Sequence, residues 1–272
     1  MKHFKIDIQG HRGCRGLFPE NSLPAFIKAI ELGVDTLELD VAISKDNIVV
    51  VTHEPYMNPD ICLDANGNNI LEEEAKTYNV YGMTFEEIKL FDCGSKLYPR
   101  FPKQQKLKTY KPSLDEVLKA AKTLNPAIKF NIEIKSEEAY DEIFTPKPND
   151  FVAFVLKVLD ENNALNETNL QSFDLRILEE IKIQLPKIMV ALLVEEDEVI
   201  MEKLHKLSYA PEIISPYYKL LDKEIVRNLQ TENFKVIPWT VNSEREMQAM
   251  ISYKVDGIIT DYPDVLIGIL NQ

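Results

Sequence analysis

Cysteine is scarce in this sequence, which has only Cys14, Cys62 and Cys93 among its 272 residues. An odd number without the regular spacing of a disulfide framework does not indicate a small fold held together by disulfides. We therefore expect reduced thiols or an incidental mixture, and no chemical role for Cys14 or Cys93.

Long hydrophobic runs are also missing. No apolar run approaches the ~20 residues that a membrane-spanning helix needs, so we expect no insertion into a membrane. The first residues, MKHFKIDIQGHRG, contain no apolar segment of the kind found in signal peptides. We expect a cytoplasmic protein as the sequence stands, or a periplasmic or secreted one if a leader has been removed.

Positive charge is in the minority, with 31 lysines and arginines against 44 acidic residues and a net charge of −13. This field opposes binding to nucleic acid or to an anionic membrane surface, because no basic stripe could outweigh it. The expected partner is therefore a small molecule. Nothing in the sequence predicts an oligomeric state.

What the sequence does contain is an alternation of short apolar, β-branched runs with helix-sized segments. This pattern predicts parallel strands joined by crossover helices, and 272 residues suit a single (β/α)8 TIM barrel, which usually takes about 250. The runs span residues 4–10, 35–43, 47–54, 129–135, 168–174, 187–195, 212–218, 235–242 and 256–262. Helices are expected over residues 22–32, 222–229 and 243–252, and after the capping boxes that begin at Thr84 and Ser113.

Nine runs are one more than such a barrel needs. The link between residues 35–43 and 47–54 is only Ser44-Lys45-Asp46, whereas parallel neighbours need a crossover of about a dozen residues. We therefore predict that these two runs form an antiparallel hairpin, which leaves eight barrel strands. The hairpin would carry His53 back to the mouth of the barrel.

Residues 55–112 interrupt the alternation because they are polar and rich in turns, with one clear helix near residues 84–91. A stretch of this length between strands is usually functional. We expect one domain over residues 1–272, with residues 55–112 as an insertion over the carboxyl-end mouth of the barrel.

Three acidic residues lie inside apolar runs. Glu38 and Asp40 are two residues apart and so point to the same face of a strand, and Glu133 lies within residues 129–135. Carboxylates that converge on a barrel interior repel one another unless a cation lies between them. Oxygen ligands favour Mg2+ or Ca2+, so a divalent metal site is predicted, with a solvated acidic rim as the alternative.

Four histidines are present, and two of them have a place in this site. His3 is terminal and His205 lies in a helical stretch, so neither is assigned a role. His11 and His53 each end an apolar run, where the catalytic groups of barrels lie. Such a pair suits general acid–base catalysis; zinc binding is the alternative, although the carboxylates favour a harder ion.

Two cations and the only tryptophan complete the candidate site. Arg12 and Lys135 could bind a phosphate group, and a bound divalent ion would also offset the acidic global field. Alternatively, Arg12 pairs with an acid such as Glu20, and Lys135 neutralises the carboxylates. Trp239 ends a run, where it either walls the pocket or belongs to the core.

The polar run ends belong to a series of ordered motifs along the whole chain. They are His-Arg-Gly at 11–13, Pro-Glu-Asn-Ser at 19–22, Glu-Leu-Asp-Val at 38–41, Val-Val-Val-Thr-His at 49–53, Asp-Cys-Gly-Ser at 92–95, Pro-Ser-Leu-Asp-Glu at 112–116, Asn-Ile-Glu-Ile-Lys at 131–135, Gln-Ser-Phe at 171–173, Trp-Thr-Val-Asn at 239–242 and Asp-Gly-Ile-Ile-Thr-Asp-Tyr-Pro at 256–263. This series resembles the glycerophosphodiester phosphodiesterase family.

The resemblance implies a phospholipase-C-like barrel that hydrolyses glycerophosphodiesters to an alcohol and glycerol 3-phosphate. The implied roles are a general acid–base pair at His11 and His53, metal ligands at Glu38, Asp40 and Glu133, phosphate contacts at Arg12 and Lys135, and a buttressing pair at Glu20 and Asn21. The insertion at residues 55–112 would match the small domain that distinguishes this family from phosphoinositide lipases.

The chain departs from the family pattern beside His53. Glu54 follows this histidine where the family usually has aspartate, so its carboxylate would have to reach one methylene further to support the ring. Asp60-Ile-Cys-Leu-Asp64 stands where the family usually has Thr-Leu-x-Arg-Thr-Thr. These departures bear on the geometry of the site and on the alcohol that it accepts.

Three other interpretations stay open at this point. The chain could be a lyase that stops at a cyclic phosphate, or a glycerophosphodiester-binding protein without catalytic activity. A barrel whose rim charges are structural is the third, because a fold alone implies no function.

Overall fold

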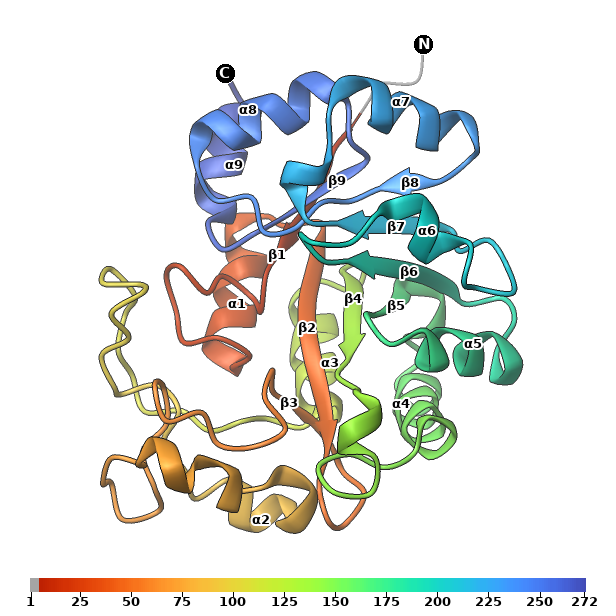
Figure 1. Cartoon of the computed structure of the whole chain (residues 1–272). Helices are drawn as coiled ribbons and strands as arrows, with labels where there is room; N and C mark the ends of the chain where they lie inside the picture. The colour runs from red at the N-terminus through yellow and green to blue at the C-terminus, as the bar shows by residue number, and fades with distance from the viewer. Residues whose placement is uncertain (1–4) are drawn as a thin grey trace.

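The computed structural model describes residues 5–272, in which strands and helices alternate and the helices pack around the outside of the strands (Figure 1). The strands are β1 (Asp7–Gly10), β2 (Thr36–Ile43), β3 (Val49–Val51), β4 (Lys129–Ile134), β5 (Thr168–Ser172), β6 (Met189–Val194), β7 (Ile213–Pro216), β8 (Lys235–Val236) and β9 (Gly257–Thr260). The α-helices are α1 (Leu23–Leu32), α2 (Phe85–Ile88), α3 (Leu114–Leu124), α4 (Pro148–Glu161), α5 (Leu175–Gln184), α6 (Ile200–Leu204), α7 (Lys223–Thr231), α8 (Glu244–Tyr253) and α9 (Pro263–Leu270).

Every strand except β3 belongs to a parallel barrel. Hydrogen-bonded neighbours follow the order β8-β7-β6-β5-β4-β2-β1-β9. The chain segments at the two ends of this series are joined by backbone hydrogen bonds from Asp256 N to Val236 O, 2.9 Å, and from Val241 N to Ile259 O, 3.0 Å. These bonds bring the sheet nearly to closure, and the predicted (β/α)8 barrel is confirmed.

The hairpin that sequence analysis predicts is present. β3 pairs with β2 in antiparallel register, with Val51 opposite Val41 and Val49 opposite Ile43. Beyond β3, Thr52 N donates to Asp40 O at 2.9 Å, so the returning chain reaches the level of Asp40 one residue before His53. The barrel therefore has eight strands, to which β3 does not belong, and the chain after β3 places His53 at the mouth.

The helix starts follow the predicted capping residues. Ser22 accepts a hydrogen bond from Ala25 N at the start of α1, and Thr84 and Ser113 form complete capping boxes before α2 and α3. These caps satisfy amide groups that have no partner within the helix. α2 ends at Ile88 and is shorter than the helix expected near residues 84–91.

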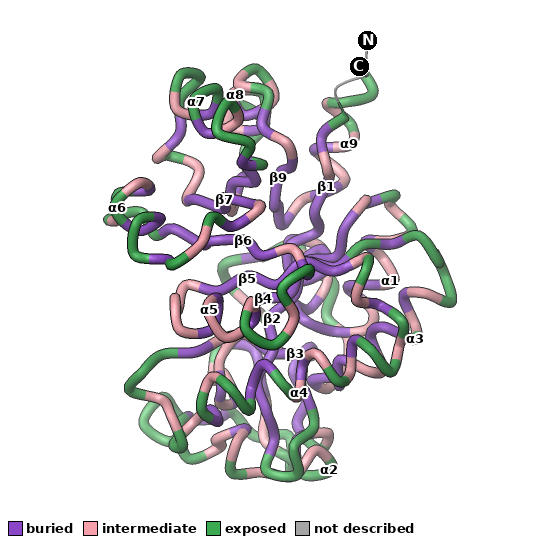
Figure 2. The backbone as a smooth tube through the Cα atoms, turned by 90° about the vertical axis from the view of Figure 1, so that its right-hand side faces the viewer, coloured by how far each residue is buried: buried purple, intermediate pink, exposed green. Residues whose placement is uncertain are grey.

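The two faces of the barrel strands differ in chemistry. Leu37 and Leu39 of β2 are fully buried and belong to the large apolar cluster, and the strands are coloured mostly as buried in Figure 2. On the inner face, Asn131 donates through Nδ2 to Gln9 Oε1 at 2.8 Å and to Gln171 Oε1 at 3.1 Å. Because these amides satisfy one another, the barrel interior can hold polar side chains below the mouth.

The segment between β3 and α3 has a small core of its own. It carries α2 and two 3-10 turns, Glu72–Thr77 and Val80–Gly82, and lies beside the carboxyl end of β2 (Figure 1). Its apolar cluster includes Met57 and Phe91 and also contacts Val50 of β3. The segment is thus packed onto the hairpin that carries His53.

The expectation of unpaired thiols is wrong for two of the three cysteines. Cys62 and Cys93 form a disulfide across a sequence separation of 31 residues. The two cysteines meet because their neighbours in the sequence pair with each other: Leu63 N donates to Asp92 O at 2.7 Å in an isolated antiparallel bridge. Cys14 is free and buried, as expected.

Within residues 5–272, no helix is both long and apolar enough to cross a membrane. His205 follows α6 and is exposed. His3, the fourth histidine, lies outside the described residues.

Candidate active site

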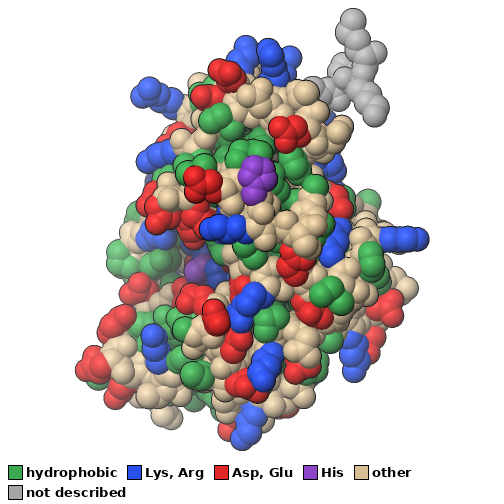
Figure 3. Space-filling view, turned by 45° about the vertical axis from the view of Figure 1, so that its right-hand side comes forward, with side chains coloured by type: hydrophobic (Ala, Val, Ile, Leu, Met, Phe, Trp, Pro, Cys, Tyr) green, Lys and Arg blue, Asp and Glu red, His purple; other side chains and the backbone are tan. Residues whose placement is uncertain are grey.

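A pocket of about 560 Å³ opens at the carboxyl ends of the barrel strands. Eight of the residues predicted for the site line it: His11, Arg12, Glu38, His53, Glu54, Glu133, Lys135 and Trp239. Asp40, Glu20 and Asn21 are buried behind this lining. In Figure 3, a histidine lies in a hollow bordered by acidic and basic side chains.

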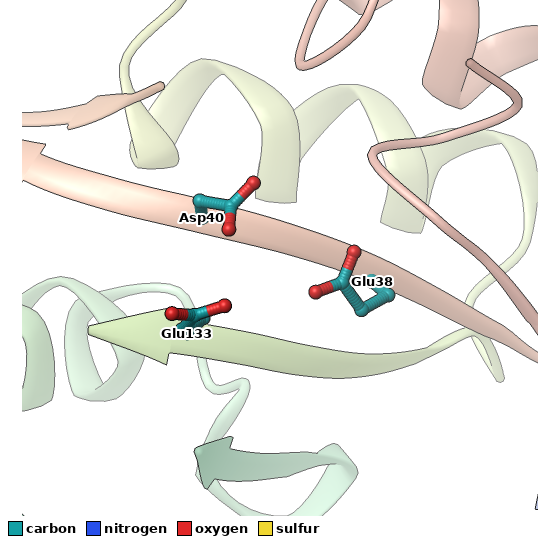
Figure 4. Close-up of side chains that lie close together, drawn as sticks. All are labelled: Glu38, Asp40 and Glu133. Atoms are coloured by element: carbon teal, nitrogen blue, oxygen red, sulfur yellow. The ribbon is translucent and has the colours of Figure 1, made fainter. Parts of the chain in front are cut away.

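Glu38, Asp40 and Glu133 converge as the strand pattern predicts. β2 and β4 pair in parallel register with Asp40 directly opposite Glu133. One carboxylate oxygen from each residue lies within 4.8 Å of the others, and all three side chains point into the same space (Figure 4). All three residues are buried, so the alternative of a solvated acidic rim is wrong.

Neighbouring donors hold two of these carboxylates in place. Gln171 Nε2 donates to Glu38 Oε1 at 2.9 Å, and the backbone N–H of Arg12 donates to the other oxygen at 3.0 Å. Asn21 Nδ2 donates to Asp40 Oδ2 at 2.8 Å. These bonds fix the direction of the acids, as residues around a metal ligand commonly do.

The electrostatics of the cluster fit a divalent cation. Burial, followed by the charge of Asp40, raises the pKa of Glu38 well above its usual value, and burial raises the pKa of Glu133 against the opposing charge of Lys135. Burial would also raise the pKa of Asp40, but the charge of Arg12 lowers it below its usual value. Three buried carboxylates with only partial compensation are a donor set of the kind that Mg2+ and Ca2+ bind.

His11 follows β1 and is nearly buried. Its Nδ1 lies 2.6 Å from Asp261 Oδ1, so the ring donates there, while Nε2 lies 3.9 Å from Glu38 Oε2. Burial and the charge of Arg15 lower the pKa of His11 to about 4, although Asp261 opposes the shift. The ring is therefore neutral near pH 7 and offers Nε2 as a proton acceptor beside the acidic cluster.

Asp261 and Arg15 are absent from the residues that sequence analysis assigns to the site. Arg15 Nε donates to Asp261 Oδ1 at 2.8 Å, and its Nη1 lies 3.6 Å from Glu20 Oε2. Asp261 directly follows β9, so its position at a strand end was a usable signal. Arg15 lies in the loop after β1 and follows no such rule.

His53 has an equivalent carboxylate partner in Glu54. Its Nδ1 lies 2.8 Å from Glu54 Oε1, and its Nε2 lies 3.1 Å from Lys135 Nζ. Burial would raise the pKa of Glu54, but the hydrogen bond from His53 lowers it below its usual value. The longer glutamate side chain thus does reach the ring, at the position where the chain departs from the family pattern.

Arg12 forms the ion pair that sequence analysis leaves open. Its Nη1 lies 2.7 Å from Glu20 Oε1, and its Nε lies 3.3 Å from Asp40 Oδ2. The backbone of Arg12 has a positive φ of 50°, and the following Gly13 has 89°. A Cβ on Gly13 would lie 2.7 Å from the backbone carbon of Ala25, so this turn requires glycine. Arg12 also lines the pocket.

Lys135 and Trp239 face the same pocket. Lys135 Nζ lies 2.7 Å from Glu133 Oε1, and this charge raises the pKa of Lys135 although burial alone would lower it. Trp239 donates from Nε1 to Ser215 O at 2.9 Å, and its ring packs edge-on against Phe173 with centroids 5.5 Å apart. Trp239 also packs on a small apolar cluster, so it contributes both to the core and to the pocket wall.

Carboxylates arranged for a hard cation, between two histidines and beside two cationic side chains, define a barrel enzyme that acts on phosphate esters. Comparison with known proteins identifies the family. The sequence model of the Glycerophosphoryl diester phosphodiesterase family matches residues 11–265, and the chain belongs to this family.

The similarity to individual relatives extends over nearly the whole chain. The chain is 30% identical to a glycerophosphodiester phosphodiesterase from Caldanaerobacter subterraneus subsp. tengcongensis over 98% of its own length and 99% of the relative's. A crystal structure of a protein of this family from Silicibacter pomeroyi superposes with a TM-score of 0.87 at 28% identity, covering 98% of this chain and 95% of that one. An Oleispira antarctica phosphodiesterase, crystallised with the product sn-glycerol-3-phosphate, has the same fold, with a TM-score of 0.77, 21% identity, and 98% and 97% coverage.

Proposed function

We propose that this phosphodiesterase hydrolyses glycerophosphodiesters to an alcohol and glycerol 3-phosphate, and that it needs Mg2+ or Ca2+ held by Glu38, Asp40 and Glu133. The observation that carries the proposal is the convergence of these three buried carboxylates within 4.8 Å of one another, two of which, Glu38 and Glu133, line the pocket together with His11 and His53. The product seen in the Oleispira antarctica relative supports glycerol 3-phosphate as the product class.

The ion would supply a Lewis acid that polarises the phosphate and lowers the pKa of the attacking group, either water or the substrate's neighbouring hydroxyl. The chain itself supplies the proton transfers. We assign His11 as the base, because Asp261 holds its Nδ1–H and leaves the neutral Nε2 to accept a proton. His53 is then the acid that protonates the leaving alcohol.

The remaining predicted residues bind and orient. Arg12 and Lys135 would offset the charge that develops on the phosphoryl oxygens, and Trp239 would form an apolar wall beside the organic part of the substrate. Glu20 and Asn21 hold Arg12 and Asp40, respectively, through bonds of 2.7 and 2.8 Å. We also propose that the chain acts as one domain, with residues 55–112 as an insertion that contributes Pro55, Tyr56 and Arg100 to the pocket wall.

Product analysis by phosphorus NMR tests this function. A panel of glycerophosphodiesters with choline, ethanolamine, glycerol or inositol is incubated with the protein and Mg2+, Ca2+ or Mn2+. The proposal expects glycerol 3-phosphate and the free alcohol in equal amounts. A persistent cyclic phosphate would instead assign a lyase, and binding in calorimetry without turnover would assign a binding protein.

The histidine pair is tested in the same assay. His11→Ala and His53→Ala should each lower kcat by a factor of about 100 or more, because general acid–base groups contribute about that much. His205→Ala, at an exposed histidine outside the pocket, is the matched control and should keep the wild-type rate. Wild-type turnover in either of the first two variants would contradict the pairing.

A further inference from the structure

Lys111 is a buried cation to which the proposed mechanism gives no role. It is only 1% exposed and is among the largest fully buried side chains in residues 5–272. Its Nζ makes no hydrogen bond. Burying an ammonium group is costly unless opposite charges or acceptors offset the loss of hydration, so its position calls for compensating charges nearby.

The backbone places Lys111 beside the segment that carries His53. Val50 of β3 forms an antiparallel bridge with Ser113, and Val51 N donates to Pro112 O at 2.8 Å. Because the pairing is antiparallel, Thr52, two residues after Val50, lies level with Lys111, two residues before Ser113. Lys111 is therefore at the base of the turn formed by His53 and Glu54.

Two acids, Glu20 and Glu54, act on the charge of Lys111, and their own contacts distinguish them. Burial lowers the pKa of Lys111, and the charges of Glu20 and then Glu54 oppose that shift. Glu20 already has Arg12 at 2.7 Å and Arg15 at 3.6 Å. Glu54 binds His53 through Oε1, but its Oε2 is buried without a hydrogen-bond partner. Glu54 is thus the acid whose second oxygen is still uncompensated.

We propose that Lys111 is a positioning residue, whose buried ammonium stabilises the Glu54 carboxylate through its charge, without a direct hydrogen bond, and thereby orients the ring of His53 toward the pocket. This inference rests on the proposed function, since it gives His53 a role in turnover. It also offers a reason for the Glu54 carboxylate to be buried: one oxygen binds the ring of His53, and the second is left for the charge of Lys111 to compensate.

The first test separates positioning from simple stabilisation by kinetics. Lys111→Met keeps the length and removes the charge, and it should lower kcat by about 10-fold or more with KM unchanged. In a Glu54→Gln background the same substitution should lower kcat little further, because the charge of Glu54 on which Lys111 acts is already removed. Lys182→Met is the matched control; Lys182 is 14% exposed, pairs with Glu212 at 2.7 Å, and donates to Ile188 O just before β6, at the other end of the barrel.

The second test does not depend on turnover. The chain has four histidines, so selective isotope labelling gives few ring signals, and His53→Gln assigns those of His53. Lys111→Met should shift the His53 ring signals and leave those of His205 unchanged. Lys111→Gln serves in both tests if the methionine variant does not fold.

The outcomes distinguish the two proposals. If the wild-type protein turns over no glycerophosphodiester, the proposed function fails, while the His53 signals still test the placement of Lys111. Unchanged His53 signals in Lys111→Met would overturn the inference. So would a loss of kcat that is equally large in the wild-type and Glu54→Gln backgrounds.

Discussion

The two histidines at the mouth have the same kind of partner but different surroundings. A carboxylate lies 2.6 Å from Nδ1 of His11 and 2.8 Å from Nδ1 of His53. The His11 side chain is 10% exposed and the His53 side chain 30%. This difference suits the roles proposed for them, because a shielded neutral ring can act as a base, while the more open ring of His53 can reach the leaving group of a bound substrate.

The burial of His11 predicts a pH dependence of stability. Its pKa in the folded chain, about 4, lies below the ordinary 6.5, so the unfolded chain binds the additional proton between these values. The stabilisation is therefore complete above pH 6.5 and is lost as the pH falls toward 4, by about 3 kcal/mol. His11→Gln should lose less of its free energy of unfolding over this range than the wild type.

The measurement is urea unfolding at pH 7.5 and pH 4.5 in the presence of a chelator. Both proteins contain the same other titrating groups, so only the difference between them reports on His11. An equal loss of free energy in wild type and variant would contradict the stated burial of a neutral ring.

Substitution of Asp261 should affect kcat rather than substrate binding. Asp261→Asn removes the carboxylate that fixes Nδ1 of His11 and pairs with Arg15. We expect kcat to fall by about 10- to 100-fold, because the ring loses its orienting acceptor. Asp256→Asn is a control at the other end of the barrel, where Asp256 accepts from Val236 N at 2.8 Å. Equal kcat values for the two variants would show that Asp261 does not act through His11.

At the scale of elements, the segment between β3 and α3 depends on local features for its shape. It contains short turns around a small apolar cluster, and the Cys62–Cys93 disulfide closes a long stretch of it. Because this stretch has little regular secondary structure, we expect the disulfide to contribute much of its stability. The cross-link does so by restricting the conformations of the unfolded chain.

Reduction should therefore loosen this segment more than the barrel. Closing a loop of 31 residues stabilises the folded state by about 3 to 4 kcal/mol in the chain-entropy description. Limited proteolysis should cut within residues 55–112 faster when reductant is present. A Cys62→Ser, Cys93→Ser double variant should be cut at one rate with or without reductant, and identical digestion of oxidised and reduced wild type would contradict the prediction.

At the scale of the whole molecule, much of the architecture could be predicted from the sequence. The alternation of runs and capped helices indicates the barrel, and the three-residue link at Ser44–Asp46 indicates the hairpin, because both are local in the chain. The acidic cluster could be predicted for a similar reason. Side chains two residues apart share a strand face, and parallel strands bring their carboxyl ends to one rim.

The features that sequence analysis misses depend on packing between distant segments. Asp261 is 250 residues from His11; its place at the end of a strand could be predicted, but its contact with His11 depends on β1 and β9 lying side by side. Cys62 and Cys93 lie next to the bridge between Leu63 and Asp92, which joins two segments that are distant in the sequence. In the sequence Lys111 looks like an ordinary polar residue of that segment, and nothing there indicates that its side chain is buried.

Removal of the metal tests whether the buried carboxylates hold an ion that glycerophosphodiester hydrolysis needs. The rate of glycerol 3-phosphate release is measured after exhaustive chelation and again during titration with Mg2+ or Ca2+. For the wild type we expect the rate to vanish after chelation and to return when the ion is added. Asp40→Asn should need at least about 10-fold more ion than the wild type. Asp7→Asn, at the amino end of β1, is the control and should need no more ion than the wild type. A full rate in chelator, or an Asp40→Asn variant with the wild-type ion requirement, would contradict the account.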